Sequence, residues 1–203
     1  MLLTLPAAVA LAVSAGPIVA ALFQGGKFTA EDARTTGLVL SIIVSGLPAY
    51  VMIKVLTPGF YARKDMKTPV LVAFIALIVG VTANFLLIPL IGIAALATTT
   101  AVSAWLNALV LYVILARRGH FHFEGWLVSR LLRQLVAAAA MAAALYGVRM
   151  LLEDRFAGSA GDRLLGVAAL IAAGGLVYFT VAWVIGAMNK DDILILLRRK
   201  KPS

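Results

Sequence analysis

Six long apolar runs dominate this sequence of 203 residues. They cover residues 2–23, 36–56, 70–90, 93–115, 131–152 and 164–188. A helix that spans a membrane needs roughly 20 apolar residues, and only helices and closed barrels satisfy every backbone polar group in lipid. The runs lack the period-two alternation of barrel strands. The sequence therefore predicts an all-α, polytopic membrane protein with six transmembrane helices.

The composition excludes two other classes of protein. Hydrophobic residues make up 63% of the chain and charged residues 13%, and the mean hydropathy is +1.01. Soluble domains are roughly 45–50% apolar and about 25% charged, and a disordered chain needs low hydrophobicity. A water-soluble enzyme and a disordered chain are both excluded. The sequence contains no cysteine, which rules out a disulfide framework and a thiolate metal site.

The basic residues fall mainly on one side of the predicted spans. Twelve lie in the even-numbered connections and the tail: Arg63, Lys64, Lys67, Arg117, Arg118, Arg130, Arg133, Lys190, Arg198, Arg199, Lys200 and Lys201. The other side has five, matched by five acids: Lys27, Arg34, Arg149, Arg155 and Arg163 against Glu31, Asp32, Glu153, Asp154 and Asp162. Because cytoplasmic loops carry the excess of Lys and Arg, both ends of the chain are expected in the cytoplasm. The net charge of +9 is then a topology signal and does not indicate nucleic-acid binding.

The first run could be a signal peptide or a span. No Lys or Arg precedes it, and it continues past the possible cleavage site to Phe23, which favours a span. Pro6 and Pro17 predict a bend or a break in this helix. The run begins at Met1 with no flanking anchor, which we expect of a chain cut out of a longer protein.

The connections divide the chain into parts. Residues 89–92 join spans three and four as a tight hairpin. Residues 117–133 form a longer, amphipathic linker expected to lie in the membrane interface. It separates a four-helix part, residues 1–116, from two further helices and a basic cytoplasmic tail, residues 134–203.

Lys54 lies in the last two turns of the second apolar run, flanked by apolar residues, and Tyr50 precedes it by one helical turn. One interpretation is a cation that lines a cavity and meets an anionic headgroup. The other is a lysine near a helix end that snorkels to the cytoplasmic interface. The sequence leaves both open.

Uncharged polar residues mark spans three and four. Thr100, Ser103 and Asn107 fall on one face of span four, and Asn84 lies in span three. They predict either interhelical hydrogen bonds or the polar wall of a cavity.

Evidence for catalysis or a cofactor is weak. The predicted spans contain no Asp or Glu, which argues against a proton or sodium antiporter. His120 and His122 have only Glu124 nearby, so we expect interfacial histidines and no metal site. The hydrolase, metalloprotease and Walker motifs are missing from the sequence, and we expect neither an enzyme nor a cofactor.

Two stretches carry a family resemblance. LPAAVALAVSAGPIVAALFQGGKFTAEDA runs from Leu5 to Ala33, and IKVLTPGFYARKDMKTPV runs from Ile53 to Val70. In this order and at this spacing they resemble the C-terminal lobe of the MurJ (MviN) family. These are lipid II flippases of peptidoglycan synthesis, within the multidrug/oligosaccharidyl-lipid/polysaccharide exporter superfamily.

The resemblance implies an architecture. The family has fourteen transmembrane helices in two lobes with two extra helices at the end, and the six spans here would be the ninth to the fourteenth. The extra pair helps to form a groove taken to hold the lipid tail. The headgroup-binding arginines of the family lie in the first lobe, which this sequence lacks. Lipid II, an undecaprenyl-pyrophosphate-linked precursor, would be the substrate in the bacterial inner membrane. Surrounding lipids and the missing N-terminal lobe would be the partners.

Lys54 lies in the matching Lys-Val-Leu-x-Pro-Gly-Phe-Tyr motif. The candidate substrate-binding residues are Lys54, Tyr50, Asn84 and Asn107, and the candidate cytoplasmic gate loop contains Pro58, Gly59, Arg63, Lys64 and Lys67. The alternatives are an exporter of other lipid-linked polysaccharides or small cationic drugs, and a membrane scaffold without transport. Transport assays with lipid II against another lipid-linked sugar distinguish the exporters. A fragment that folds stably without a partner lobe favours the scaffold.

Overall fold

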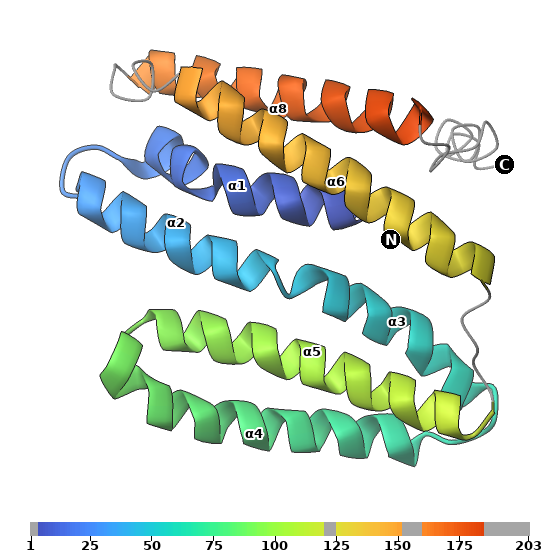
Figure 1. Ribbon diagram of the computed structural model, residues 1–203. Helices are drawn as coiled ribbons and strands as arrows, with labels where there is room; N and C mark the ends of the chain where they lie inside the picture. Colours follow the sequence, from blue (N-terminus) through green and yellow to red (C-terminus); the bar gives the residue numbers. More distant parts are fainter. Residues whose placement is uncertain (1–3, 120–124, 152–159, 185–203) are drawn as a thin grey trace, which may run out of the picture.

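The computed structural model describes residues 4–119, 125–151 and 160–184, and helices account for nearly all of them (Figure 1). The helices are α1 (Thr4–Phe23), α2 (Ala30–Val44), α3 (Leu47–Tyr61), α4 (Lys67–Ile91), α5 (Ala94–Arg117), α6 (Gly125–Leu151) and α8 (Ala160–Val184). By length and composition, six stretches of the described residues can cross a membrane, with α2 and α3 together forming one of them. The predicted all-α fold with six spans is confirmed. The expectations for His120, His122 and the basic tail concern residues outside those described.

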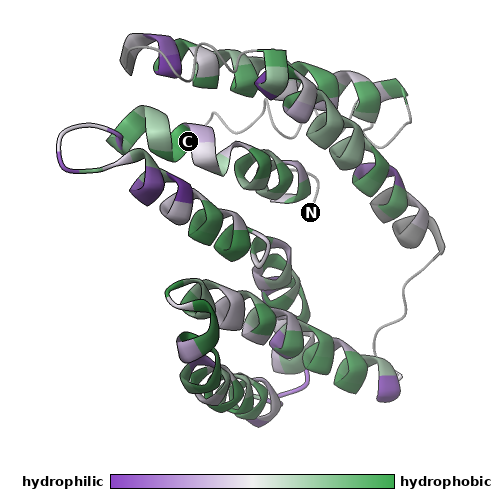
Figure 2. Cartoon of the chain, turned by 60° about the vertical axis from the view of Figure 1, so that its left-hand side comes forward, coloured by the Kyte–Doolittle hydropathy of each residue, from purple (hydrophilic) through white to green (hydrophobic). Residues whose placement is uncertain are grey.

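The connections gather at two opposite ends of the bundle (Figure 1). The α1–α2 and α4–α5 connections lie at one end, which we call the Lys27 end. The α3–α4 connection and the start of α6 lie at the other, which we call the Arg63 end. Hydrophobic residues fill the middle of the helices, and hydrophilic residues concentrate toward their ends (Figure 2). The grouping of loops is the one that the sequence predicts.

Two groups of helices meet along the α2–α3 span. In the first, α1 packs against α2, α6 and α8, and α6 packs against α8. In the second, α5 packs against α3 and α4, and it also contacts α2. The core of the first group contains Met141, Leu145, Leu170 and Tyr178. The core of the second group contains Leu56, Phe60, Val72, Leu111 and Leu115.

Helix α4 shows why the outer surface needs lipid. It is apolar on nearly every side, and only 6% of its most apolar 18-residue stretch is buried. Phe74, Ile78 and Phe85 are among its exposed side chains. A helix that is apolar all round belongs in a large core or in a membrane, so its outward surface is suited to acyl chains.

The second span is interrupted, which the sequence analysis did not predict. The expected continuous run 36–56 is instead α2 and α3, which extend from Ala30 to Tyr61 and break at Ser45 and Gly46. Pro48 lies in the first turn of α3, where its missing N–H costs no helical hydrogen bond. The indole Nε1 of Trp105 donates to the Ser45 carbonyl at 3.1 Å, so the break leaves that carbonyl satisfied.

Helix α1 is continuous although Pro17 lies inside it, so the break expected there does not occur. It contacts four other helices, α2, α3, α6 and α8, and Ala8, Ala15 and Val19 are buried. This packing is that of an integral part of the bundle, in agreement with the span interpretation.

Small residues set the distance between α1 and α2. A Cβ added at Gly37 would lie 2.7 Å from the Gly16 Cα and 3.0 Å from the Gly16 nitrogen. Both are backbone atoms, which cannot rotate away. Glycine at position 37 therefore allows the two helices to touch backbone to backbone, as small residues do in membrane bundles.

We predict that Gly37→Ala lowers the free energy of unfolding by about 1–3 kcal/mol, the usual cost of overpacking, measured by thermal unfolding in detergent. Gly147→Ala is the matched control, because a Cβ at Gly147 meets nothing within 4 Å. Equal stabilities of the two variants would contradict the close approach of α1 and α2.

Candidate functional site

A cavity of about 410 Å³, with several polar side chains in a mainly apolar lining, lies between α3, α4 and α5. Its lining is Tyr50 and Ile53 from α3, Ala73, Ala76, Leu77, Gly80, Val81 and Asn84 from α4, and Leu96, Thr99, Thr100, Ser103, Ala104 and Asn107 from α5. Three of the four predicted substrate-binding residues thus line one cavity: Tyr50, Asn84 and Asn107. Their role in binding stays a prediction.

Helical periodicity builds the α5 wall. Thr100, Ser103 and Asn107 are three and four residues apart and share a face. The Thr100 hydroxyl donates to the Leu96 carbonyl of its own helix at 2.6 Å. Its hydrogen is therefore satisfied without a partner in the cavity.

The two asparagines differ from the threonines. The side-chain oxygens of Asn84 and Asn107 are buried and accept no hydrogen bond from the described part of the chain. A buried acceptor without a partner costs about 1–3 kcal/mol. Both asparagines line the cavity, and their buried oxygens have no donor among the described residues.

Small residues keep the α4 wall close to α5. A Cβ added at Gly80 would collide with the Ser103 hydroxyl oxygen, so the absence of a side chain at position 80 makes room for that hydroxyl. Ala76 and Ala104 complete this part of the lining. Because these residues have small side chains or none, they leave part of the space between α4 and α5 unfilled.

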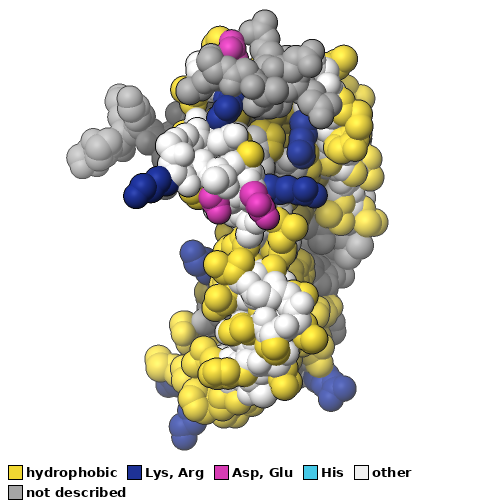
Figure 3. All heavy atoms as spheres, turned by 90° about the vertical axis from the view of Figure 1, so that its left-hand side faces the viewer, with side chains coloured by type: hydrophobic (Ala, Val, Ile, Leu, Met, Phe, Trp, Pro, Cys, Tyr) yellow, Lys and Arg dark blue, Asp and Glu magenta, His cyan; other side chains and the backbone are white. Residues whose placement is uncertain are grey.

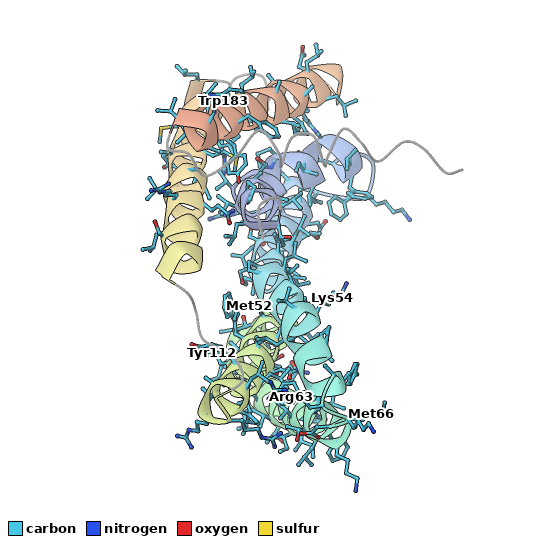
Figure 4. The ribbon with its side chains drawn as sticks, turned by 90° about the vertical axis from the view of Figure 1, so that its right-hand side faces the viewer. Met52, Lys54, Arg63, Met66, Tyr112 and Trp183 are labelled. Carbon is cyan, nitrogen blue, oxygen red and sulfur yellow. The ribbon has the colours of Figure 1, made fainter. Side chains whose placement is uncertain are left out.

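Lys54 lies outside the cavity lining, one turn after Tyr50 on the same face of α3. It is exposed, and it projects from α3 away from the side that carries Met52 (Figure 4). Because α3 continues to Tyr61, Lys54 lies seven residues before the end of the helix, or roughly 10 Å at 1.5 Å per residue. The predicted end at Leu56 placed it closer to the interface. A snorkelling side chain has farther to reach than the sequence indicated.

The predicted gate loop is shorter than expected. The sequence placed a loop from Thr57 to Pro69, but Pro58 and Gly59 lie in the last turn of α3, and Lys67 is the first residue of α4. A proline in the final turn of a helix removes one N–H and leaves the turn intact here. Of the five gate residues only Arg63 and Lys64 lie between the helices, and their role as a gate stays a prediction.

Asp65 holds this connection against α5, and the sequence analysis did not single it out. Its carboxylate accepts from Arg118 Nη1 at 2.6 Å and from the Thr68 hydroxyl at 2.7 Å and backbone N–H at 3.0 Å. These hydrogen bonds, Thr68 first and then Arg118, lower the pKa of Asp65 from 3.8 to about 2. The sequence does set Asp65 apart, because it is the one acidic residue among the basic residues of this connection.

An apolar groove of about 380 Å³ lies between α1, α6 and α8. Its lining includes Leu11 and Ile18 from α1, Leu145 from α6, and Ile171 and Phe179 from α8. Gly174 lets Leu145 approach α8, since an added Cβ would lie 2.9 Å from a Leu145 methyl. The last two helices thus form an apolar groove together with α1.

Six apolar spans, with a cavity between three of the helices, define a multi-pass membrane protein. The family model described as lipid II flippase MurJ matches residues 1–161. The chain belongs to this family.

Individual relatives agree with the family match. A probable lipid II flippase MurJ of Rhizobium meliloti is 41% identical over 98% of this chain, and the lipid II flippase MurJ of Burkholderia cenocepacia is 39% identical over 91%. A solved structure of lipid II flippase MurJ in an inward closed conformation matches 97% of the chain with a TM-score of 0.65 at 23% identity, which supports the fold. The chain spans 38%, 36% and 37% of the length of these three proteins.

We predict a pH-dependent stability from Asp65. Its folded-state pKa is depressed, so the stabilisation is complete above the unfolded value of 3.8 and is lost as the pH falls toward 2. Thermal unfolding from pH 7 to pH 2 should show Asp65→Asn less stable than wild type at neutral pH, with the difference closing in this range.

Arg118→Gln should reproduce part of this loss, and the neighbouring Arg117→Gln is the matched control with the same change in charge. A constant difference between wild type and Asp65→Asn down to pH 2 would contradict the role of the carboxylate.

Proposed function

We propose that this chain is part of a lipid II flippase, which moves the lipid-linked peptidoglycan precursor across the bacterial inner membrane by alternating access. Membership of the MurJ family carries the proposal, together with relatives whose names state this activity. We place the chain in the C-terminal lobe because the stretches Leu5–Ala33 and Ile53–Val70 resemble that lobe. The chain spans 38% of the length of its R. meliloti relative, and it would work against an N-terminal lobe. Transport in this mode requires one lobe to move against the other, so the chain alone does not flip lipid.

The cavity between α3, α4 and α5 is suited to a sugar or peptide headgroup. The hydroxyl and amide groups of such a headgroup can donate hydrogen bonds. The buried side-chain oxygens of Asn84 and Asn107 are acceptors without a described donor. The Tyr50 ring stands at the exposed edge of the same cavity. One turn farther along, Lys54 adds positive charge that attracts the pyrophosphate.

The apolar groove between α1, α6 and α8 is suited to the polyprenyl tail. The surface of the groove is almost wholly apolar, so a polyprenyl chain there would contact apolar side chains of the protein in place of lipid chains. The cavity and the groove lie in different helix groups of the bundle, so headgroup and tail would contact separate walls.

The Arg63 end faces the cytoplasm in this proposal, because it carries the excess of basic residues. Both ends of the chain are then cytoplasmic. The Asp65–Arg118 pair holds Arg63 and Lys64 at the cytoplasmic mouth, where movement of α3 relative to α5 would open or close access.

The asparagine oxygens provide a test that separates binding from folding. In a chimera that joins this chain to the N-terminal part of the R. meliloti relative, Asn84→Leu and Asn107→Leu should lower lipid II flipping about tenfold, the loss of one hydrogen bond to a ligand. Thermal unfolding should show no loss of stability, since removing an unsatisfied polar group is neutral or favourable.

Thr98→Val is the control, because Thr98 bonds the Ala94 carbonyl of its own helix at 2.9 Å and does not line the cavity. Flipping is measured as lipid II that becomes accessible outside reconstituted vesicles. Unchanged flipping with lowered stability would make the asparagines structural. Equal transport of another lipid-linked sugar would favour the broader exporter.

Lys54 is tested in the same chimera. Lys54→Ala should lower flipping severalfold, and Lys54→Arg should retain most of it, because the proposed role needs a positive charge near the cavity. Lys27→Ala removes one charge at the opposite end as a control. Wild-type flipping by Lys54→Ala would return this residue to a snorkelling anchor.

A further inference from the structure

A second cavity, about 440 Å³, lies at the Lys27 end between α1, α2 and α6. Its lining is Gly16, Pro17, Ala20, Gln24, Ala30, Ala33, Arg34, Tyr146, Arg149 and Met150. Figure 3 looks onto this end and shows Lys and Arg side chains gathered around the α1–α2 connection, above a mostly hydrophobic surface over α4 and α5. This cavity is separate from the one that contains Asn84 and Asn107, and the proposed function does not use it.

Two arginines from different helices line the cavity. Arg34 lies in the second turn of α2, and Arg149 in the last turn of α6. Neither forms an ion pair with a residue that the structure describes. Arg163 at the start of α8 donates to the backbone carbonyl of Gln24, itself a lining residue, at 3.3 Å. Positive side chains from three helices therefore converge on this place.

The nearby acids do not fill the cavity. Asp32 is engaged by Thr29, which donates to it from the backbone at 2.9 Å and from the hydroxyl at 2.7 Å. Glu31 is exposed, and neither acid is among the lining residues. This end of the bundle carries as many acids as bases in sequence, including Asp162 next to Arg163. The described lining itself has two guanidinium groups and no carboxylate, so within the cavity the charge favours an anion.

The depth and the surroundings indicate an amphiphile. The cavity lies where three spans end, which is the level of lipid headgroups. Its floor is small and apolar, with Gly16, Pro17 and Ala20, and Leu38 is exposed one turn below Arg34 on α2. Guanidinium groups bind phosphate oxygens in a bidentate geometry.

We propose that Arg34 and Arg149 form a binding site for the phosphate of an anionic membrane lipid at the Lys27 end of the bundle. The phosphodiester lies between the two guanidinium groups, and an acyl chain follows the exposed surface of α2 past Leu38. The site takes a resident lipid that bridges α2 and α6, the two helices that flank α1.

The test uses the purified 203-residue chain in detergent and native mass spectrometry to measure bound lipid. Dioleoyl phosphatidylglycerol is titrated as the probe, dioleoylglycerol supplies the same chains without phosphate, and inorganic pyrophosphate supplies phosphate without chains. Phosphatidylglycerol should bind at one tight site, and dioleoylglycerol should not. Competition by pyrophosphate at concentrations equal to the lipid would overturn the assignment to a lipid.

Variants locate the site. Arg34→Gln and Arg149→Gln should each weaken phosphatidylglycerol binding about tenfold, as expected for one charge-assisted hydrogen-bonding partner. Lys27→Gln removes the same charge from the same end but lies outside the lining, and it should bind as wild type does.

Arg149→Lys keeps the charge and loses the fork, so it should fall between wild type and Arg149→Gln. Ala30→Leu narrows the cavity at an exposed position without changing charge and should also weaken binding. Equal losses in Lys27→Gln and Arg149→Gln would reduce the effect to general charge and overturn the site. So would unchanged binding in both arginine variants at wild-type stability.

Discussion

Close contact between helix backbones is the interaction on which the rest of this structure depends. In lipid, helices gain little from burying apolar surface against one another, because the acyl chains are equally apolar, and packing through small residues takes over. Gly16 and Gly37 allow α1 to pack against α2. A Cβ added at Gly46 would lie 3.3 Å from the Ala101 Cα of α5. These contacts tie the broken second span to both helix groups.

The same constraint shapes the polar features. Each backbone group inside lipid needs a partner, so the break at Ser45 persists because Trp105 satisfies the freed carbonyl. Gly80 allows α4 to approach Ser103, yet the asparagine oxygens nearby remain without a described donor. The break in the second span is therefore satisfied from within the bundle, whereas the two asparagine side chains at the cavity are not.

The sequence predicted the spans well because length and hydropathy alone set them. It did not predict the break in the second span, although Gly46 and Pro48 are the expected signals, because the apolar run continues through them. It also could not bring Asn84 and Asn107 to the same cavity. Because helix α4 is apolar on nearly every side, the pattern of hydrophobic residues alone does not identify the face that meets α5. Pairing between helices is a tertiary property that spacing within one helix does not contain.

The boundaries of the charged segments were harder to predict. Pro58 and Gly59 predicted a loop, but tertiary packing keeps these residues in the helix. Gly59 lies against Leu115, and the buried Phe60 belongs to the same core as Leu115. This extension moves Lys54 away from the helix end and shortens the basic connection to residues 62–66. Asp65 and Arg118, more than 50 residues apart, meet only once α3 and α5 are packed.

We propose that this chain supplies part of one lobe of a transporter and needs the N-terminal part of the protein to work. The most direct measurement is growth of flippase-depleted bacteria that express this chain alone or joined to the N-terminal part of the R. meliloti relative. We predict that the joined protein restores growth and that the chain alone, present in the membrane at the same level, does not. Restored growth with the chain alone would contradict the account.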